Sequence, residues 1–542
     1  MYIKKNAMMF YLIRLANLPF AVILCLLTFS EVAGQHTDNE KFDVLIQNAC
    51  VFDGTGRDSM FVDVGIRADR IVFVGEPKRA YKADRVINGE GLYLTPGFID
   101  PHSHYNKYLS DEDSSERALM RCLRQGVTTV FTGNDGAGPW PIGETLDNWE
   151  KLGVGVNIGL FVPHGTVRTK VIGFRNIGAS ASQLDKMKDM VEAGMEDGGF
   201  GLSTGLFYTP GTFAKTEEVI ELAKVAAAYG GIYDTHQRDE GDQNTDVGVI
   251  NSIKEVLEIG EKANIPVHIS HIKTTGTSVW GKSNEIIKMV EEAQRKGINV
   301  SANQYPYLAA RAYLRSWLLP VWVREGGYEA MRRRLEDPQL KDSVLHGIRQ
   351  LIAKQTGAAE RLHLSTTTHE FLDGKTLADV AEDWGIPVED AVLRIALSEE
   401  SRMSVLVHSF SMSEEDLLNF MVQPWVMTGS DGDLGHPRAF GTFARILREY
   451  TLDRHLFSMA YAVYRSSGLT AATLNVKDRG LIKEGYFADL VLFDPNEIKD
   501  NATYENGEQL ASGVCYVIVN GELTIDNGKY TGVLAGKSLR LN

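Results

Sequence analysis

Hydrophobic residues in the middle of the chain recur in eight short runs, each followed by polar residues and then by an amphipathic stretch. The stretch Ser283–Gly297 is typical, because its apolar residues recur at the spacing of one helix face, namely Ile286, Met289, Val290 and Ala293. Short apolar runs that alternate with such helices are typical of parallel βαβ units. We therefore predict a parallel (β/α)8 barrel over residues 95–470. The predicted strands lie in Thr95–His104, Gly126–Asp135, Val154–Arg168, Gly199–Gly211, Gly231–Glu240, Ile265–Thr275, Ile298–Tyr307 and Trp425–Asp433.

The two ends of the chain show a different pattern, in which short β-rich runs are separated by turns. Asp43–Ile46 and Arg70–Val74 are such runs near the start, and Ala488–Phe493 and Val514–Val519 are such runs near the end. This arrangement predicts one small β-sandwich domain formed by both termini. We assign residues 42–94 and 471–542 to its two parts.

A long segment separates the seventh run from the eighth. Its charged helical patterns include Thr376–Trp384 and Val388–Ser398. We therefore predict a helical insertion over residues 308–424, in a position where a barrel enzyme can carry a lid.

The first 34 residues have the pattern of a signal peptide. Lys4, Lys5 and Arg14 precede the apolar stretch Leu18–Phe29, and the small residues Val32-Ala33-Gly34 end the segment. We expect residues 1–34 to be removed on export, which predicts a periplasmic or secreted protein with no stable membrane insertion afterwards. An uncleaved membrane anchor is the alternative.

Charge and cysteine content exclude several classes of protein. The net charge of −15 argues against a nucleic-acid-binding protein. Only four cysteines occur in 542 residues, with no CxxC pair, so neither a disulfide framework nor a cysteine-based zinc site is expected. The sequence leaves the oligomeric state open.

Potential metal ligands stand at the ends of the predicted strands. His102 and His104 end the first run, His236 lies in the fifth, His271 in the sixth and Asp431 in the eighth. The carboxyl ends of barrel strands meet at one face, where such enzymes build their sites. His-x-His at a strand end can grip one ion, because alternate side chains point the same way. Any one of these residues alone could be a core residue, but the set together predicts a metal site.

The motifs as a set resemble the amidohydrolase superfamily, and within it the N-acyl-D-amino-acid deacylase (D-aminoacylase) family. The resemblance covers nearly all of the chain after residue 34. The matching motifs include Pro96–His104, Gly201–Leu206, Tyr305-Pro306-Tyr307, Gly429–Gly432, His436-Pro437-Arg438 and Gly485–Asp494. The resemblance implies a zinc hydrolase with a split β-sandwich beside the barrel.

Two features of the chain refine what the resemblance implies. The family commonly has a bridging Cys where this chain has Asp135, and a carboxylate can also bridge two ions. We expect Asp135, His236 and His271 to hold the tighter ion, with His102 and His104 at a second position. One or two Zn²⁺ ions are expected, with Mn²⁺ or Co²⁺ as alternatives. The fourth run has no lysine, which argues against urease-like and dihydroorotase-like chemistry.

The expected reaction is hydrolysis of an N-acyl-D-amino acid to a free D-amino acid and a carboxylate. Asp431 is expected to take the proton from the attacking water and pass it to the leaving amine. The resemblance implies that Lys273 and Arg438 bind the substrate carboxylate and that Tyr208 and Tyr305 line the site. Arg311, at a position where the family usually has Ser, is a candidate for binding an acidic side chain, as in an N-acyl-D-glutamate.

Two alternatives remain open. One is an exported dipeptidase or cyclic-amide hydrolase of the same superfamily. The other is a catalytically silent barrel that acts as a binding protein, which the full set of candidate ligands disfavours.

Overall fold

The computed structural model describes residues 41–76, 81–242, 247–366, 370–398, 405–433 and 435–541. The predicted signal peptide, residues 1–34, lies outside these described residues. Among the described helices, none is both long and apolar enough to cross a membrane.

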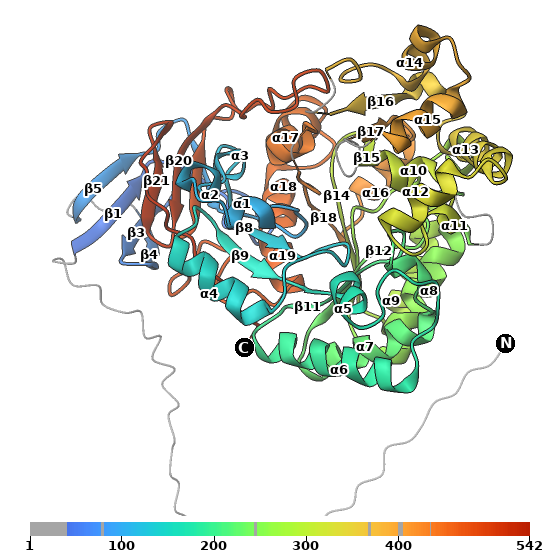
Figure 1. The fold of residues 1–542 in the computed structure, drawn as a ribbon. Helices are drawn as coiled ribbons and strands as arrows, with labels where there is room; N and C mark the ends of the chain where they lie inside the picture. The colour runs from blue at the N-terminus through green and yellow to red at the C-terminus, as the bar shows by residue number, and fades with distance from the viewer. Residues whose placement is uncertain are drawn as a thin grey trace, which may run out of the picture.

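Eight parallel strands form a barrel in the middle of the chain (Figure 1). One part has the order β7-β8-β9 and the other β10-β11-β12-β13-β14-β18. Only Phe161 separates β9 from β10, so these two form one interrupted third strand. A parallel bridge between Ser103 and Gly432 joins the first strand to the last. The predicted (β/α)8 barrel is confirmed. Its strands are β7 (Phe98–Asp100), β8 (Val127–Thr132), β9 (Asn157–Leu160), β10 (Val162–Pro163), β11 (Gly201–Gly205), β12 (Ile232–His236), β13 (Val267–Ile269), β14 (Val300–Gln304) and β18 (Val426–Thr428).

Amphipathic helices cover the outside of the barrel. In α9 (Ser283–Arg295), three apolar residues of the predicted helix face, Ile286, Val290 and Ala293, are buried. The fourth, Met289, is partly buried against the same core. The other helices around the barrel are α1 (Asn106–Leu109), α2 (Ser114–Arg117), α3 (Met120–Leu123), α4 (Ile142–Leu152), α5 (His164–Val171), α6 (Ala181–Glu196), α7 (Thr216–Ala228), α8 (Gly248–Ala263), α16 (Glu414–Met421), α17 (Arg438–Arg445), α18 (Met459–Ser466) and α19 (Gly468–Thr473).

Apolar packing fills the barrel near the amino ends of its strands. Phe200 and Ile232, at the amino ends of β11 and β12, share a buried cluster with Ala471 of α19. The C-terminal residues reach the same end, where the amide of Leu539 donates a hydrogen bond to the carbonyl of Ile158. The buried polar groups discussed below therefore gather at the opposite, carboxyl end.

Strands from both ends of the chain form the predicted β-sandwich domain beside the barrel (Figure 1). Ile46 and Val64 from the N-terminal part pack in one buried cluster with Leu490 and Ile518 from the C-terminal part. One sheet consists of β4 (Arg70–Gly75), β3 (Asp63–Arg67), β1 (Lys41–Gln47) and β5 (Lys82–Asn88). The other consists of β2 (Cys50–Val51), β6 (Tyr93–Pro96), β19 (Leu490–Phe493), β20 (Val514–Val519), β21 (Glu522–Asp526) and β22 (Lys529–Tyr530).

The insertion differs from the purely helical segment that the sequence predicts. An antiparallel sheet of β15 (Ala310–Tyr313), β17 (Leu406–Ser409) and β16 (Leu362–Ser365) packs with the helices around a buried core of its own. The helices are α10 (Leu314–Leu318), α11 (Val321–Arg324), α12 (Tyr328–Glu336), α13 (Lys341–Gln355), α14 (Leu377–Trp384) and α15 (Val388–Leu397). They gather on one side of the barrel (Figure 1).

The predicted end of the insertion at residue 424 is also wrong. Helix α16 packs against α9 and β18, both of which belong to the barrel. It serves as the barrel helix between the seventh and eighth strands, so the insertion ends before α16 begins.

Candidate metal centre and substrate cavity

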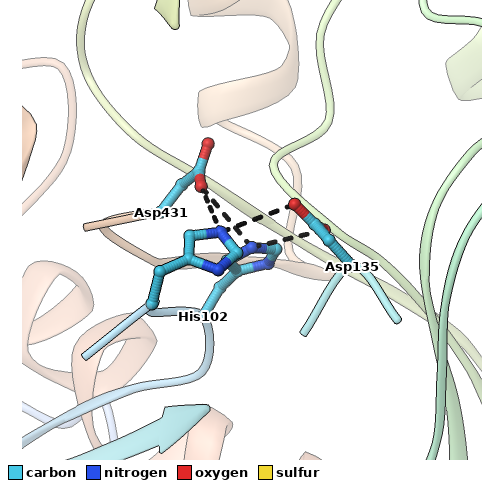
Figure 2. A group of neighbouring side chains, drawn as sticks. His102, Asp135 and Asp431 are labelled. Carbon is cyan, nitrogen blue, oxygen red and sulfur yellow. Dashed lines mark hydrogen bonds and ion pairs between the residues drawn. The ribbon is translucent and has the colours of Figure 1, made fainter. Parts of the chain in front are cut away.

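Six predicted site residues converge at the carboxyl ends of the barrel strands. His102 and His104 follow β7, Asp135 follows β8, and Asp431 follows β18. These four offer donor atoms that all lie within 4.8 Å of one another. Figure 2 shows His102 between the carboxylates of Asp135 and Asp431. A second group, whose donor atoms also lie within 4.8 Å of one another, contains Asp135, His236 at the end of β12, and His271 after β13.

The spacing of the first group matches the first coordination shell of a metal ion. His102 Nε2 lies 3.5 Å from Asp135 Oδ1 and 3.5 Å from Asp431 Oδ1. His104 Nε2 lies 3.5 Å from Asp135 Oδ2 and 3.1 Å from Asp431 Oδ1. Ligands bound tetrahedrally at the usual zinc distances lie roughly 3.3 Å from one another, because each is about 2.0 Å from the ion.

The second group has similar dimensions and shares Asp135 with the first. His236 Nδ1 lies 2.9 Å from His271 Nε2. Asp135 Oδ1 lies 3.5 Å from His271 Nε2, and Asp135 Oδ2 lies 3.7 Å from His236 Nδ1. Asp135 therefore lies between the two groups, where a bridging carboxylate would have to lie.

Unsatisfied buried atoms indicate that these residues fit a metal. Both ring nitrogens of His102 and Oδ1 of Asp135 are buried and have no hydrogen-bond partner among the described residues. Buried polar atoms without partners are rare, because each costs free energy. Imidazole nitrogens and carboxylate oxygens around one point form the donor set that divalent transition metals prefer.

Left-handed backbone conformations occur at three of the converging residues. The φ angles are 57° at Asp135, 35° at His271 and 48° at Asp431. The amide of Asp431 donates to the carbonyl of His102 at 2.9 Å, and the amide of His271 donates to Asn303 Oδ1 at 2.9 Å. Such conformations cost free energy in residues other than glycine, so their presence at three site residues marks a functional geometry.

Glu240 is a site residue that the sequence analysis did not identify. Its Oε1 accepts a hydrogen bond from Lys273 Nζ at 2.6 Å and lies 3.0 Å from His271 Nδ1. Burial would raise the pKa of Glu240, but Lys273 and the imidazoles of His236 and His271 lower it to about 2. A carboxylate at Nδ1 is the usual partner of a histidine that binds metal through Nε2. Its position four residues after His236 was the available sequence signal.

Asp431 is held as a carboxylate in a buried site. Its Oδ2 lies 2.7 Å from Arg438 Nη1, and its Oδ1 lies 3.1 Å from His104 Nε2. Burial would raise the pKa of Asp431, but Arg438, His271 and His104 hold it well below its usual value. The group is therefore ionised at neutral pH and able to accept a proton.

A narrow cavity opens beside this centre. All five predicted substrate-binding residues line it: Lys273, Arg438, Tyr208, Tyr305 and Arg311. Phe207 and Trp317, which the sequence analysis did not single out, add an aromatic wall. Two of the predicted cations already have a close carboxylate, Lys273 at Glu240 and Arg438 at Asp431.

Comparison with known proteins identifies a family of metal-dependent hydrolases that agrees with this site. Residues 93–524 match the Amidohydrolase family. The chain is 32% identical to D-aminoacylase of Alcaligenes xylosoxydans xylosoxydans, across 93% of this chain and 98% of that protein. It is 30% identical to N-acyl-D-aspartate deacylase of the same organism, across 90% and 93% of the two chains.

A solved structure of a related enzyme shows the same fold. It is N-acyl-D-glutamate deacylase from Bordetella bronchiseptica in complex with zinc and a phosphonate inhibitor. The TM-score is 0.78 at 27% identity, and the match covers 92% of this chain and all of that one. The chain therefore belongs to the amidohydrolase family, in the group of the D-aminoacylases.

Proposed function

We propose that the protein is a zinc-dependent N-acyl-D-amino-acid deacylase, which hydrolyses the linear amide of its substrate to a free D-amino acid and a carboxylate. The observation that carries the proposal is the pair of His/Asp donor groups, joined through Asp135, beside a cavity with cationic walls. Relatives named as D-aminoacylase and N-acyl-D-aspartate deacylase support the substrate class.

The residues that would hold zinc are the two donor groups described above. His236 and His271 with Asp135 form the group whose donor atoms approach most closely, and His102 and His104 with Asp135 and Asp431 form the other. A bound zinc ion supplies activation of water and polarisation of the amide carbonyl.

Asp431 would move the proton in the reaction. Its Oδ1 faces the metal donors, so it is placed to take a proton from the attacking water and pass it to the leaving nitrogen. Arg438 holds the other oxygen at 2.7 Å, which orients the carboxylate and keeps it ionised. The same carboxylate therefore acts first as base and then as acid.

The cations around the cavity would bind the α-carboxylate of the substrate. Arg438 stacks over the ring of Tyr305 at 4.7 Å, and Lys273 lies 5.6 Å from the same ring. Tyr208 packs against the His236 imidazole with ring centroids 4.7 Å apart. These contacts support an α-carboxylate site next to the metal donors, from which the amide bond of a short N-acyl amino acid would reach them.

Matched N-acetyl-D- and N-acetyl-L-amino acids, each assayed with zinc and with a chelator, test the function. We expect release of free amino acid from D-substrates only, with loss of turnover in chelator and recovery on addition of zinc. Chelator-sensitive turnover of L-substrates alone, or hydrolysis of cyclic amides alone, would contradict the proposal.

We also propose that the protein is exported to the periplasm or secreted after removal of residues 1–34. The support is the basic, apolar and small-residue order of that segment. Cell fractionation and N-terminal sequencing of the mature protein should find it outside the cytoplasm with Gln35 first. A cytoplasmic, full-length chain would refute this.

A further inference from the structure

We propose that Arg311 is a specificity-determining residue that binds a second carboxylate on the substrate, so that the cavity selects N-acyl derivatives of acidic D-amino acids. This inference rests on the proposed deacylase function and names the substrate class within it. Arg311 lies on β15, the first strand of the insertion, and its side chain is 7% exposed.

The three cations of the cavity differ in how they are paired. Lys273 Nζ lies 2.6 Å from Glu240 Oε1, and Arg438 Nη1 lies 2.7 Å from Asp431 Oδ2. Arg311 Nη1 approaches its carboxylate, Asp433 Oδ2, only to 3.3 Å. Its buried Nε has no hydrogen-bond partner among the described residues. Arg438 also has buried nitrogens without such a partner, Nε and Nη1, so it is the longer distance to its carboxylate that leaves Arg311 the least tightly paired of the three cations.

Asp433 does not depend on Arg311 for its charge balance. Its Oδ1 lies 3.0 Å from Lys107 Nζ and accepts a hydrogen bond from the Tyr108 hydroxyl at 3.3 Å. If Arg311 turned towards a substrate, Asp433 would still have a cation beside it. The Arg311–Asp433 contact can thus orient the guanidinium in the free protein without fixing it there.

The geometry favours a carboxylate as the second group. A guanidinium presents its donors in a fork that matches both oxygens of a carboxylate. A buried cation with an incomplete partner gains most from a ligand that supplies the missing acceptor. Arg438 and Lys273 both lie beside the ring of Tyr305, and Arg311 lines the same cavity, so a substrate with two carboxylates fits the charges around it.

The test compares kcat/KM for N-acetyl-D-glutamate and N-acetyl-D-aspartate with kcat/KM for N-acetyl-D-leucine and N-acetyl-D-methionine. The wild-type protein should prefer the acidic substrates. Arg311→Met should lower the acidic-to-neutral ratio by about 100-fold, and Arg311→Lys by less, because Lys keeps the charge but not the fork. Arg349→Met is the matched control, since it removes an exposed guanidinium of the insertion that pairs with Glu389 and does not line the cavity, and it should leave the ratio unchanged.

Zinc content and thermal unfolding of each variant show whether it is folded, and Arg311→Lys keeps the test valid if Arg311→Met does not fold. A wild-type protein with equal or better turnover of neutral D-substrates, and the same ratio in the Arg311 variants, would overturn this inference and leave the deacylase function standing. If no N-acyl-D-amino acid is hydrolysed, both fail.

Discussion

The buried pair of Glu240 and Lys273 leads to a quantitative prediction about stability. Two unit charges 2.6 Å apart attract each other by about 6 kcal/mol at an effective dielectric constant of about 20. The desolvation of both buried groups offsets much of this attraction. Removing one partner leaves the other charge buried alone, which costs about 3–5 kcal/mol. We expect Glu240→Gln and Lys273→Met each to lower the free energy of unfolding by about this amount.

The double variant separates the pair from its surroundings. With both charges removed, no buried ion is left alone, so the loss should be smaller than the sum of the single losses by at least about 2 kcal/mol. Urea denaturation followed by circular dichroism, on all four proteins with zinc and with chelator, measures this coupling. Losses that simply add, within about 0.5 kcal/mol, would refute the reasoning that these groups form a pair.

Metal retention gives an independent readout of Glu240. Because its carboxylate lies 3.0 Å from His271 Nδ1, Glu240→Gln should weaken zinc affinity by about 10–100-fold. Lys273→Met removes no hydrogen-bond acceptor from His271, so it should weaken zinc affinity less than Glu240→Gln does. Equal zinc affinity in Glu240→Gln and the wild-type protein, from competition with a chelator, would show that Glu240 does not orient the ligand.

Four further predictions follow from individual contacts. Asp431→Asn should lower kcat by about 10³-fold or more with metal still bound, and near-normal turnover would contradict its role in proton transfer. Asp135→Asn should lower the number of zinc ions per chain measured by elemental analysis, and an unchanged number would exclude a bridging role. Tyr504→Phe removes the acceptor of the Ala309 amide at 3.2 Å and should cost about 1 kcal/mol of stability, which urea denaturation will detect or exclude. Burial opposes ionisation of Asp416, but hydrogen bonds to its carboxylate lower its pKa. The ionised form therefore stabilises the fold above about pH 4, and this contribution disappears as the pH falls through the lowered pKa. The stability difference between Asp416→Asn and the wild-type protein should shrink in acid.

Much of the barrel and of the metal donors could be predicted from the sequence, for a geometric reason. All strands of a parallel barrel end at the same face, so His102, His236 and Asp431 needed only a strand assignment to be brought together. The sheet of the insertion could not be predicted in this way. Strands β15 and β17 are short, pair antiparallel and lie far apart in the chain, so no local period indicates their partnership. Helical patterns between them then dominate the prediction.

The pairing of the cavity cations with carboxylates was the other feature that could not be predicted from the sequence. Lys273, Arg438 and Arg311 all qualify as carboxylate-binding cations when only residue type and position are considered. The structure distinguishes them by distance, because Lys273 and Arg438 lie 2.6 and 2.7 Å from the carboxylates of Glu240 and Asp431, whereas Arg311 lies 3.3 Å from Asp433. A cation that is closely paired with a buried carboxylate gains less free energy from a bound ligand than a cation that is loosely paired. We therefore expect Arg311, which has the longest distance to its carboxylate, to contribute most to substrate selectivity.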